Sequence, residues 1–150
     1  HLTNKIVLEA LKFKKIDSLK HYTDIKTEIK VSNLTRFDFL ISNYKAKCYL
    51  EVKNVTLVRK KQIAEFPDSI TSRGTKHMNE LIKYKKKGFQ SCILYLIQRD
   101  NCTSFSIADD IDKNYKNSFD NAISEGVKVL CYDCKISNEE IKLNKPIKLI

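Results

Sequence analysis

The 150-residue sequence lacks any apolar run approaching the roughly 18 residues of a membrane-spanning helix. Its longest run, Cys92–Ile97, suits a buried strand instead. The opening residues, His1–Asn4, also lack the basic and then apolar segments of a secretory signal. We therefore expect a cytoplasmic protein with no membrane partner. Because the sequence has no initiator Met and opens almost at once with a helical pattern, we also expect it to be the downstream part of a longer protein.

Five cysteines is an odd number, and without a secretory signal they favour a reducing compartment over a disulfide framework. Cys131 and Cys134 form a C-x-x-C pair, but they lie in an alternating, strand-like stretch, where positions three apart face opposite sides. A second pair is absent, since Cys92 and Cys102 are ten residues apart. We expect buried small hydrophobic residues and no zinc or redox chemistry.

Tryptophan is absent and only three glycines occur, whereas Lys and Arg total 28 against 18 Asp and Glu, a net charge of +10. The excess lies in the first hundred residues, which hold 21 basic and 10 acidic side chains, while the last fifty hold seven and eight. A basic surface suits a polyanionic partner such as DNA. The alternative is a compositional bias, because 24 of the basic residues are lysines.

Hydrophobic periodicity and capping residues predict one α/β domain over residues 1–150, with a mixed five-stranded sheet and helices on both faces. Helices are expected over 4–15, 71–87 and 112–125, and strands over 24–31, 35–42, 46–58, 90–98 and 127–134. Residues 59–69 are expected to be irregular because they include Pro67. Residues 1–134 would form the core, and 135–150 an edge strand or arm restricted by Pro146.

Two of these strands place carboxylates opposite each other. Apolar and polar residues alternate in both, so a four-residue hairpin loop over 43–46 pairs Phe39 with Leu50 and sets Asp38 opposite Glu51. The same register pairs Phe37 with Val52 and places Phe37, Phe39 and Ile41 on one face.

Facing carboxylates repel, and a divalent cation between them would remove that repulsion. We therefore expect Asp38 and Glu51 to hold Mg²⁺ or Mn²⁺, with Lys53 on the same face directed at a phosphate. An acid followed by Glu-x-Lys on the next strand, within this order of elements, resembles the core of the PD-(D/E)XK restriction-endonuclease-like superfamily.

The amino-acid sequences of several segments are similar to those of one family within this superfamily, the sugar fermentation stimulation protein A family. These blocks fall in the family's order and cover most of the chain: Arg36–Phe39, Tyr49–Leu57, Phe66–Asp68, Thr71–His77 and Ile97–Arg99. The resemblance implies a DNA-binding protein described as a regulator of sugar (maltose) metabolism, in which an N-terminal OB-fold-like domain normally precedes the nuclease-like one. We expect the chain to start just past that domain.

Carried over by position, the resemblance makes Asp38 and Glu51 metal ligands and Lys53 the electrophilic or water-orienting group. It also matches Glu9 to the helix-one acid and Gln98 to the polar residue that ends the fourth strand. From the residues alone, Glu9 could reach over the sheet or be solvated at the helix margin. His77 could be a phosphate contact or proton shuttle, or an exposed histidine with neither role.

We expect contacts with DNA, without sequence preference, from six basic side chains: Arg36, Arg59, Lys60, Lys61, Arg73 and Lys76. Three functions remain open. The first is a DNA-binding regulator that keeps a nuclease-like metal site, and the second is an active Mg²⁺-dependent endonuclease. The third is an interaction module whose charge is only compositional.

Overall fold

The computed structural model describes residues 2–150, which form three α-helices, a short 3-10 helix and ten strands. The helices are α1 (Leu2–Lys12), η1 (Asp17–Leu19), α2 (Ser72–Lys86) and α3 (Lys113–Ser124). The strands are β1 (Asp24–Lys30), β2 (Arg36–Ser42), β3 (Lys47–Val55), β4 (Leu57–Lys60), β5 (Ile63–Phe66), β6 (Gln90–Ile97), β7 (Ser104–Ile107), β8 (Lys128–Ile136), β9 (Ile141–Pro146) and β10 (Lys148–Leu149).

The main sheet has six strands in the order β1-β2-β3-β6-β8-β9. Strands β1, β2 and β3 meander antiparallel, β3, β6 and β8 run parallel, and β9 returns antiparallel beside β8. Helices α2 and α3 connect the parallel strands, as expected for crossovers between parallel neighbours. The mixed α/β class is confirmed. Five strands were expected in this sheet, but it has six, because β9 (Ile141–Pro146) pairs with β8 at its edge.

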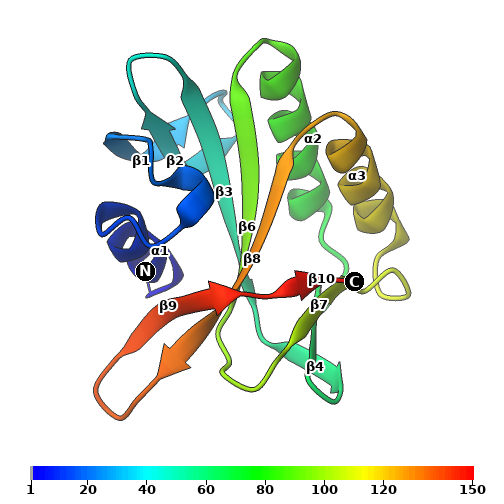
Figure 1. Cartoon of the computed structure of the whole chain (residues 1–150). Coiled ribbons are helices and arrows are strands. Elements are labelled where there is room, and N and C mark those ends of the chain that lie inside the picture. The colour runs from blue at the N-terminus through cyan, green and yellow to red at the C-terminus, as the bar shows by residue number, and fades with distance from the viewer. Residues whose placement is uncertain (1) are drawn as a thin grey trace.

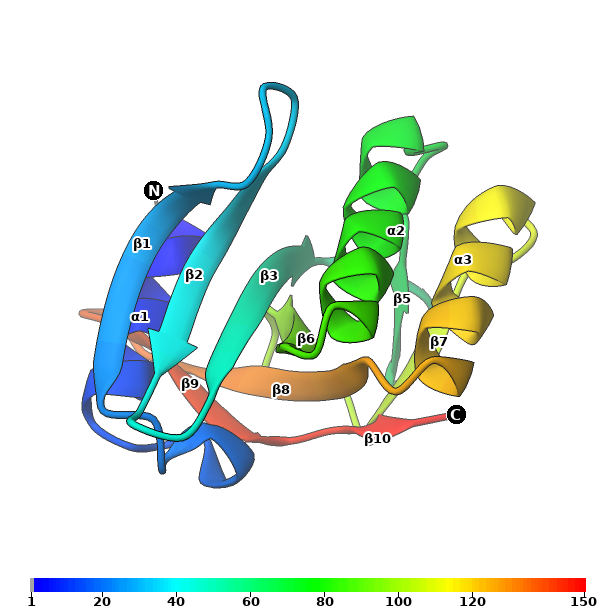
Figure 2. The same ribbon diagram turned by 90° about the horizontal axis from the view of Figure 1, so that it is seen from above.

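Helices cover both faces of the main sheet, with α1 on one side and the pair α2 and α3 on the other (Figures 1 and 2). Each side has its own apolar core. Val7 and Leu11 of α1 pack with Leu50 and Leu94, whereas Leu81 of α2 lies in the other core. Strand β6 is buried along nearly its whole length because it contributes to both cores.

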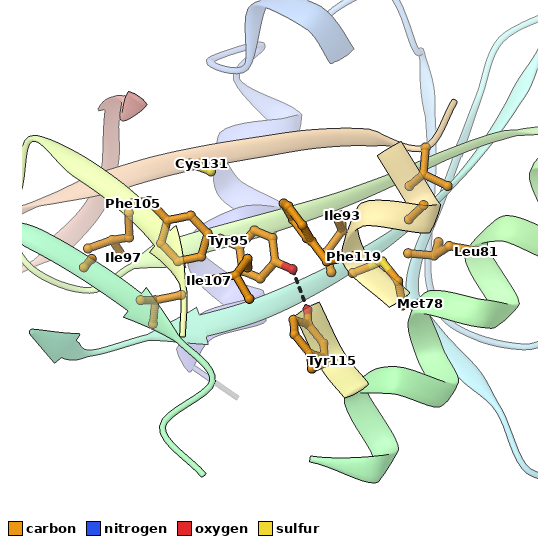
Figure 3. Packing of buried hydrophobic residues seen from close by; sticks show 14 of the residues in the cluster. Met78, Leu81, Ile93, Tyr95, Ile97, Phe105, Ile107, Tyr115, Phe119 and Cys131 are labelled. Carbon is orange, nitrogen blue, oxygen red and sulfur yellow. Dashed lines mark hydrogen bonds between the residues drawn. The ribbon is translucent and has the colours of Figure 1, made fainter. Parts of the chain in front are cut away.

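Figure 3 shows the core beneath α2 and α3, in which Tyr95 and Tyr115 point their hydroxyl groups at each other and form a hydrogen bond. Both rings are fully buried. Phenol groups in such a position require a polar partner, and here each supplies the other's. The pair fixes α3 against β6, the parallel neighbour of β3, which carries Glu51.

A second sheet of four short strands, in the order β10-β7-β5-β4, occupies one end of the molecule (Figure 1). The prediction that residues 59–69 are irregular was therefore wrong for most of that range, and the predicted strand 46–58 is divided at Thr56. Pro67 follows the last residue of β5, so it interrupts no strand. Pairing of β5 with the distant β7 stabilises this sheet, and local periodicity does not reveal such a partner.

Side-chain hydrogen bonds cap the starts of α2 and α3. Thr71 caps α2 by accepting a hydrogen bond from the amide of Gly74, and Asp112 caps α3 by accepting one from Tyr115. The second oxygen of Asp112 accepts the amide of Thr71 at 2.8 Å. One carboxylate thus joins the starts of both helices and fixes where α2 begins. All five cysteines are buried, as expected, and they carry free thiols.

Candidate functional site

The site lies where β2 and β3 separate. Their ladder runs from Ser42 and Lys47 to Phe39 and Leu50 and then stops, and the two strands diverge beyond that point (Figure 2). On its other edge, β2 pairs with β1, and this pairing is regular except opposite Asp38. The β1 residue at that position, Glu28, has a positive φ of 52°. Asp38 therefore sits at a distortion between two ladders, and its side chain is available for other contacts.

Because of this distortion, the side chains of β2 before and after Asp38 point to opposite faces of the sheet. Phe39 packs in the core beneath α1, whereas Phe37 packs against Tyr49 and Tyr84 in the core beneath α2. The expectation that Phe37, Phe39 and Ile41 share one face is therefore wrong for Phe37. A regular strand would keep residues two apart together, and only the break at Asp38 separates them.

Both carboxylate oxygens of Asp38 accept hydrogen bonds. Oδ2 accepts the backbone amide of Val52 at 2.8 Å, and Oδ1 accepts the side-chain amide of Asn4 at 2.9 Å. The first contact satisfies an amide of β3 that has lost its strand partner. The second joins the first turn of α1 to the site. Nothing in the local sequence pattern around Asn4 indicates this distant contact.

Glu51 is the most buried acid of the site, with 3% of its surface exposed. Its Oε2 atom lies 2.5 Å from Nδ1 of His77 and 3.2 Å from Nζ of Lys53, so both donors converge on one oxygen. The other oxygen, Oε1, is buried and has no hydrogen-bond partner. A buried carboxylate oxygen without a donor is costly, and it marks a position that a cation would stabilise.

The two carboxyl groups have opposite pKa shifts. Burial, followed by the negative charge of Glu51, raises the pKa of Asp38 to about 6, against the stabilising contacts from Val52 and Asn4. Burial alone would also raise the pKa of Glu51, but the hydrogen bond from His77 and the charge of Lys53 outweigh it and lower that pKa to about 2. Glu51 thus stays ionised, and Asp38 is the member of the pair that takes up a proton.

The structure brings four of the predicted residues together: Asp38, Glu51, Lys53 and His77. The idea that His77 is an exposed helix residue was wrong, because it is 4% exposed and faces β3. Its Nδ1 atom also lies 3.1 Å from Nζ of Lys53. The helical pattern could have signalled this, since His77 adjoins Met78 and lies one turn before Leu81, both fully buried.

Gln98 and Glu9 are placed differently. Gln98 follows β6, and its side-chain amide donates to the hydroxyl of Thr3 at 2.8 Å, so it contacts the first turn of α1 next to Asn4. Glu9 lines a separate cavity of about 260 Å³ between α1 and β9, together with Lys15 and Lys142. The structure therefore does not bring Glu9 to Asp38 and Glu51. The helix residue that contacts Asp38 is Asn4.

Three of the expected DNA-contacting residues border a hollow of about 560 Å³ beside the carboxylates. Arg36 borders it from the first position of β2, and Arg73 and Lys76 border it from the first half of α2, next to His77. The ammonium of Lys76 donates to the carbonyl of Leu34 at 3.2 Å, which ties the turn to the helix. This hollow is basic and opens directly beside the acidic cluster.

The other three lie elsewhere. Arg59 forms paired hydrogen bonds of 2.7–2.8 Å with both Glu65 and Asp110, so two carboxylates already match its charge. Those contacts raise the pKa of Arg59 further above its usual range. Lys60 and Lys61 are exposed at the end of β4, in the second sheet.

The donor set suits a hard cation held by few protein ligands. Within residues 2–150, no three His, Cys, Asp or Glu side chains are arranged as a metal-binding group. Asp38 and Glu51 would therefore act as two oxygen ligands, and water and substrate oxygens would complete the shell, as Mg²⁺ commonly requires. In the same part of the chain, no helix is both long and apolar enough to cross a membrane.

The fold and this cluster define a mixed α/β domain with a buried carboxylate pair, a lysine and a histidine at the point where two strands part. Residues 1–140 match the family model described as the sugar fermentation stimulation protein RE domain. The chain belongs to the sugar fermentation stimulation protein family, as the residue blocks indicated.

Relatives of known sequence and structure agree. Sugar fermentation stimulation protein homologs from Pelagibacter ubique and Clostridium acetobutylicum are 44% and 41% identical over 150 residues. The alignments cover 100% and 99% of this chain but 65% and 64% of those proteins, so the chain spans less than two thirds of their length. A solved structure, described as Pyrococcus furiosus SfsA in complex with Ca²⁺, shares the fold, with a TM-score of 0.90 at 23% identity over 99% of this chain and 64% of that one.

Proposed function

We propose that this domain binds a divalent cation between Asp38 and Glu51 and cleaves phosphodiester bonds in DNA. The observation that carries the proposal is Oε1 of Glu51, which is buried and lacks a hydrogen-bond donor in a group that stays ionised. Oε2 of the same group receives two donors. Oε1 of Glu51 therefore lacks a positive partner, and it lies beside the carboxylate of Asp38, where a cation would stabilise both groups.

The choice of cation follows from the ligands. Carboxylate oxygens are hard donors, which favours Mg²⁺ or Mn²⁺ over softer metals. The solved relative is described as a complex with Ca²⁺, another hard cation that takes oxygen ligands. When bound here, the ion would supply Lewis acidity toward a phosphoryl oxygen and a lowered pKa for water.

The protein's own groups have separate tasks. Asp38 and Glu51 hold the negative charge that attracts the cation, and Val52 and Asn4 fix the orientation of Asp38. Lys53 lies within 3.2 Å of Glu51, so its ammonium group can stabilise charge that develops on a phosphate bound there. His77 holds Glu51 in place from the helix side.

Charge and shape support DNA as the substrate. The hollow beside the pair is bordered by Arg36, Arg73 and Lys76, so a phosphate backbone would find cations next to the carboxylates. The overall charge of +10 would add an attraction that does not depend on sequence. We propose contacts to the backbone only, and therefore little sequence preference. The free cysteines fit a cytoplasmic location.

A plasmid-nicking assay on the full-length protein with Mg²⁺ and Mn²⁺ tests this function. We expect nicking that EDTA abolishes and that Glu51→Gln reduces at least about a hundredfold. Glu139→Gln removes an exposed carboxylate from the β8–β9 turn and serves as the matched control. Equal nicking by wild type and Glu51→Gln would show that the activity has another source.

The second candidate is a DNA-binding regulator of sugar (maltose) metabolism that keeps the site without cutting. The contacts within the cluster favour it, since the ammonium of Lys53 and the ring of His77 already occupy Oε2 of Glu51, and Asp38 can be protonated. This function requires DNA binding that weakens with salt and no nicking with either metal. The nicking assay and a binding titration on the same protein therefore separate the two candidates.

A further inference from the structure

A stripe of charged, mostly basic residues runs along α2 to its C-cap residue Lys87, away from the carboxylate pair. Arg73, Lys76, Glu80, Lys83 and Lys87 are spaced three, four, three and four residues apart. With 3.6 residues per turn, this spacing keeps all five on one side of the helix. The opposite side, which includes Met78 and Leu81, is buried against the sheet. The stripe holds four cations and one acid over about 21 Å of helix.

Three adjoining hollows follow the stripe. The first is the hollow of about 560 Å³ beside His77, which Lys76 borders. Lys76 and Lys83 both border a second, of about 380 Å³. Lys83 and Lys87 both border a third, of about 450 Å³. Each hollow shares a lysine with the next, so the three lie in a row along α2 from the candidate site to the far end of the helix.

The charges of the stripe are largely available to a ligand. Within residues 2–150, no carboxylate lies within ion-pairing distance of Arg73, Lys76, Lys83 or Lys87. Lys76 donates to a backbone carbonyl, and Lys87 lies 4.7 Å from the ring centre of Tyr84. This contrasts with Arg59, whose charge is taken up by two carboxylates.

We propose that this stripe, which we call the track, binds the phosphate backbone of duplex DNA where the duplex extends beyond the candidate site. This inference rests on the proposed function and adds Lys83 and Lys87 to the DNA-binding residues. Four cations with no carboxylate partner, along a straight helix, complement a row of phosphates. The stripe offers no exposed aromatic ring, since Tyr84 is half-buried beneath Lys87. Proteins that hold single strands rely on such rings for base stacking, so the duplex is the better match.

The test measures how the affinity for a fluorescein-labelled 20-bp duplex of mixed sequence changes with salt, by anisotropy of the full chain in EDTA so that no cleavage occurs. The double variant Lys83→Gln/Lys87→Gln should reduce the slope of log affinity against log salt by about 2, because each lost phosphate contact removes about 0.9. The control Lys135→Gln/Lys148→Gln removes the same charge from exposed residues of β8 and β10 and should leave the slope nearly unchanged.

Glu80→Gln gives a second, opposite readout. Removing the one acid of the stripe should strengthen duplex binding about two- to fivefold at low salt, as expected for loss of a like-charge contact with phosphate. Equal slopes for the two double variants, weaker binding by Glu80→Gln, or equal affinity for a 20-nucleotide single strand would each overturn the track.

Failure of the track differs from failure of the catalytic proposal. The control variant Lys135→Gln/Lys148→Gln should nick plasmid at the wild-type rate, whereas Asp38→Asn should lose nicking and keep the wild-type salt slope in EDTA. A protein that never nicks but shows the predicted change in slope overturns cleavage and supports the track. A protein that nicks plasmid, but whose two double variants have identical salt slopes, supports cleavage and overturns the track.

Discussion

Nδ1 of His77 lies 2.5 Å from Oε2 of Glu51, in a contact between α2 and β3 that excludes solvent from both groups. The contact explains how a carboxylate can be 3% exposed and still remain ionised. It also saturates Oε2 together with Lys53, so the unpartnered Oε1 is the oxygen left to attract a cation. The relationship joins the stability of the fold to the chemistry proposed for it.

Replacing His77 with leucine should therefore destabilise the domain. Oε2 of Glu51 would lose its closest donor, and the free energy of unfolding should fall by about 1–3 kcal/mol. Urea unfolding at pH 7.5, followed by circular dichroism, measures the change. His77→Gln keeps an amide donor and should recover part of the loss. If leucine and glutamine are equally stable there, the contact with Glu51 contributes little.

Asp38→Asn should stabilise the metal-free protein at neutral pH but not in acid. The pKa of Asp38 is raised from 3.8 to about 6, so the folded state holds a proton that the unfolded state releases between these values. The free energy of unfolding of the wild type consequently falls as pH rises from about 4 to about 6, and it stays lower above that. The variant lacks this loss and should be about 1–3 kcal/mol more stable at pH 7.5.

Unfolding midpoints in urea at pH 4 and pH 7.5, with EDTA present, check this sign. The two proteins should converge at the lower pH. Asp68→Asn, which changes an exposed acid, provides the reference for a pH-independent effect. An advantage for Asp38→Asn that is equal at both pH values would contradict the raised pKa.

The affinity for Mn²⁺ should depend on pH through the same group. Asp38 must lose its proton to act as a ligand, so affinity should rise about tenfold per unit below pH 6 and level off near pH 7. Calorimetric titrations in buffers with different ionisation enthalpies would count the proton released. Glu9→Gln should leave the affinity unchanged, because Glu9 lines another cavity. Affinity that is flat between pH 5 and 7 would contradict the assignment.

Lys53→Met should separate binding from chemistry. The ammonium of Lys53 competes for the charge of Glu51, so its removal should maintain or tighten Mn²⁺ binding. Nicking should fall about a hundredfold or more, as expected when a cation that stabilises transition-state charge is lost. Parallel calorimetry and nicking on one preparation measure both. Loss of the metal site in this variant would mean that Lys53 organises the pair instead.

Arg59→Gln should affect stability without affecting DNA binding. Its guanidinium joins Glu65 of β5 to Asp110, so the unfolding midpoint should fall while the salt slope of DNA affinity stays at the wild-type value. Arg73→Gln is the matched comparison, because Arg73 borders the basic hollow, and its loss should reduce the slope by about 0.9. Equal slopes for the two variants would contradict the division between structural and ligand-facing arginines.

The sequence contained much of this fold because its signals are local. Alternation predicted the register of Phe39 with Leu50, and capping residues predicted that the second helix starts at Thr71 or Ser72 and the third at Asp112, where the structure has caps at Thr71 and Asp112. The second sheet was missed because β5 is four residues long and its stabilising partner β7 is distant in sequence. Short strands of this kind form through tertiary pairing rather than through their own periodicity.

Part of the candidate site could also be predicted from local sequence signals. The acidic pair and Lys53 follow from spacing along two adjacent strands. The burial of His77 and the contact from Asn4 depend on how helices pack over the sheet, and the reversed facing of Phe37 depends on a distortion opposite Glu28. The pairing of Arg59 with Asp110 spans 51 residues, and no local pattern encodes it.

A crystal structure of the wild-type protein grown with Ca²⁺ at pH 7.5 would show whether Asp38 and Glu51 share one cation. The anomalous difference map should show one strong peak about 2.3–2.6 Å from an oxygen of Asp38 and from Oε1 of Glu51, and no such peak in Glu51→Gln crystals. A peak elsewhere, or an empty pair with Lys53 and His77 still bound to Glu51, would contradict the account.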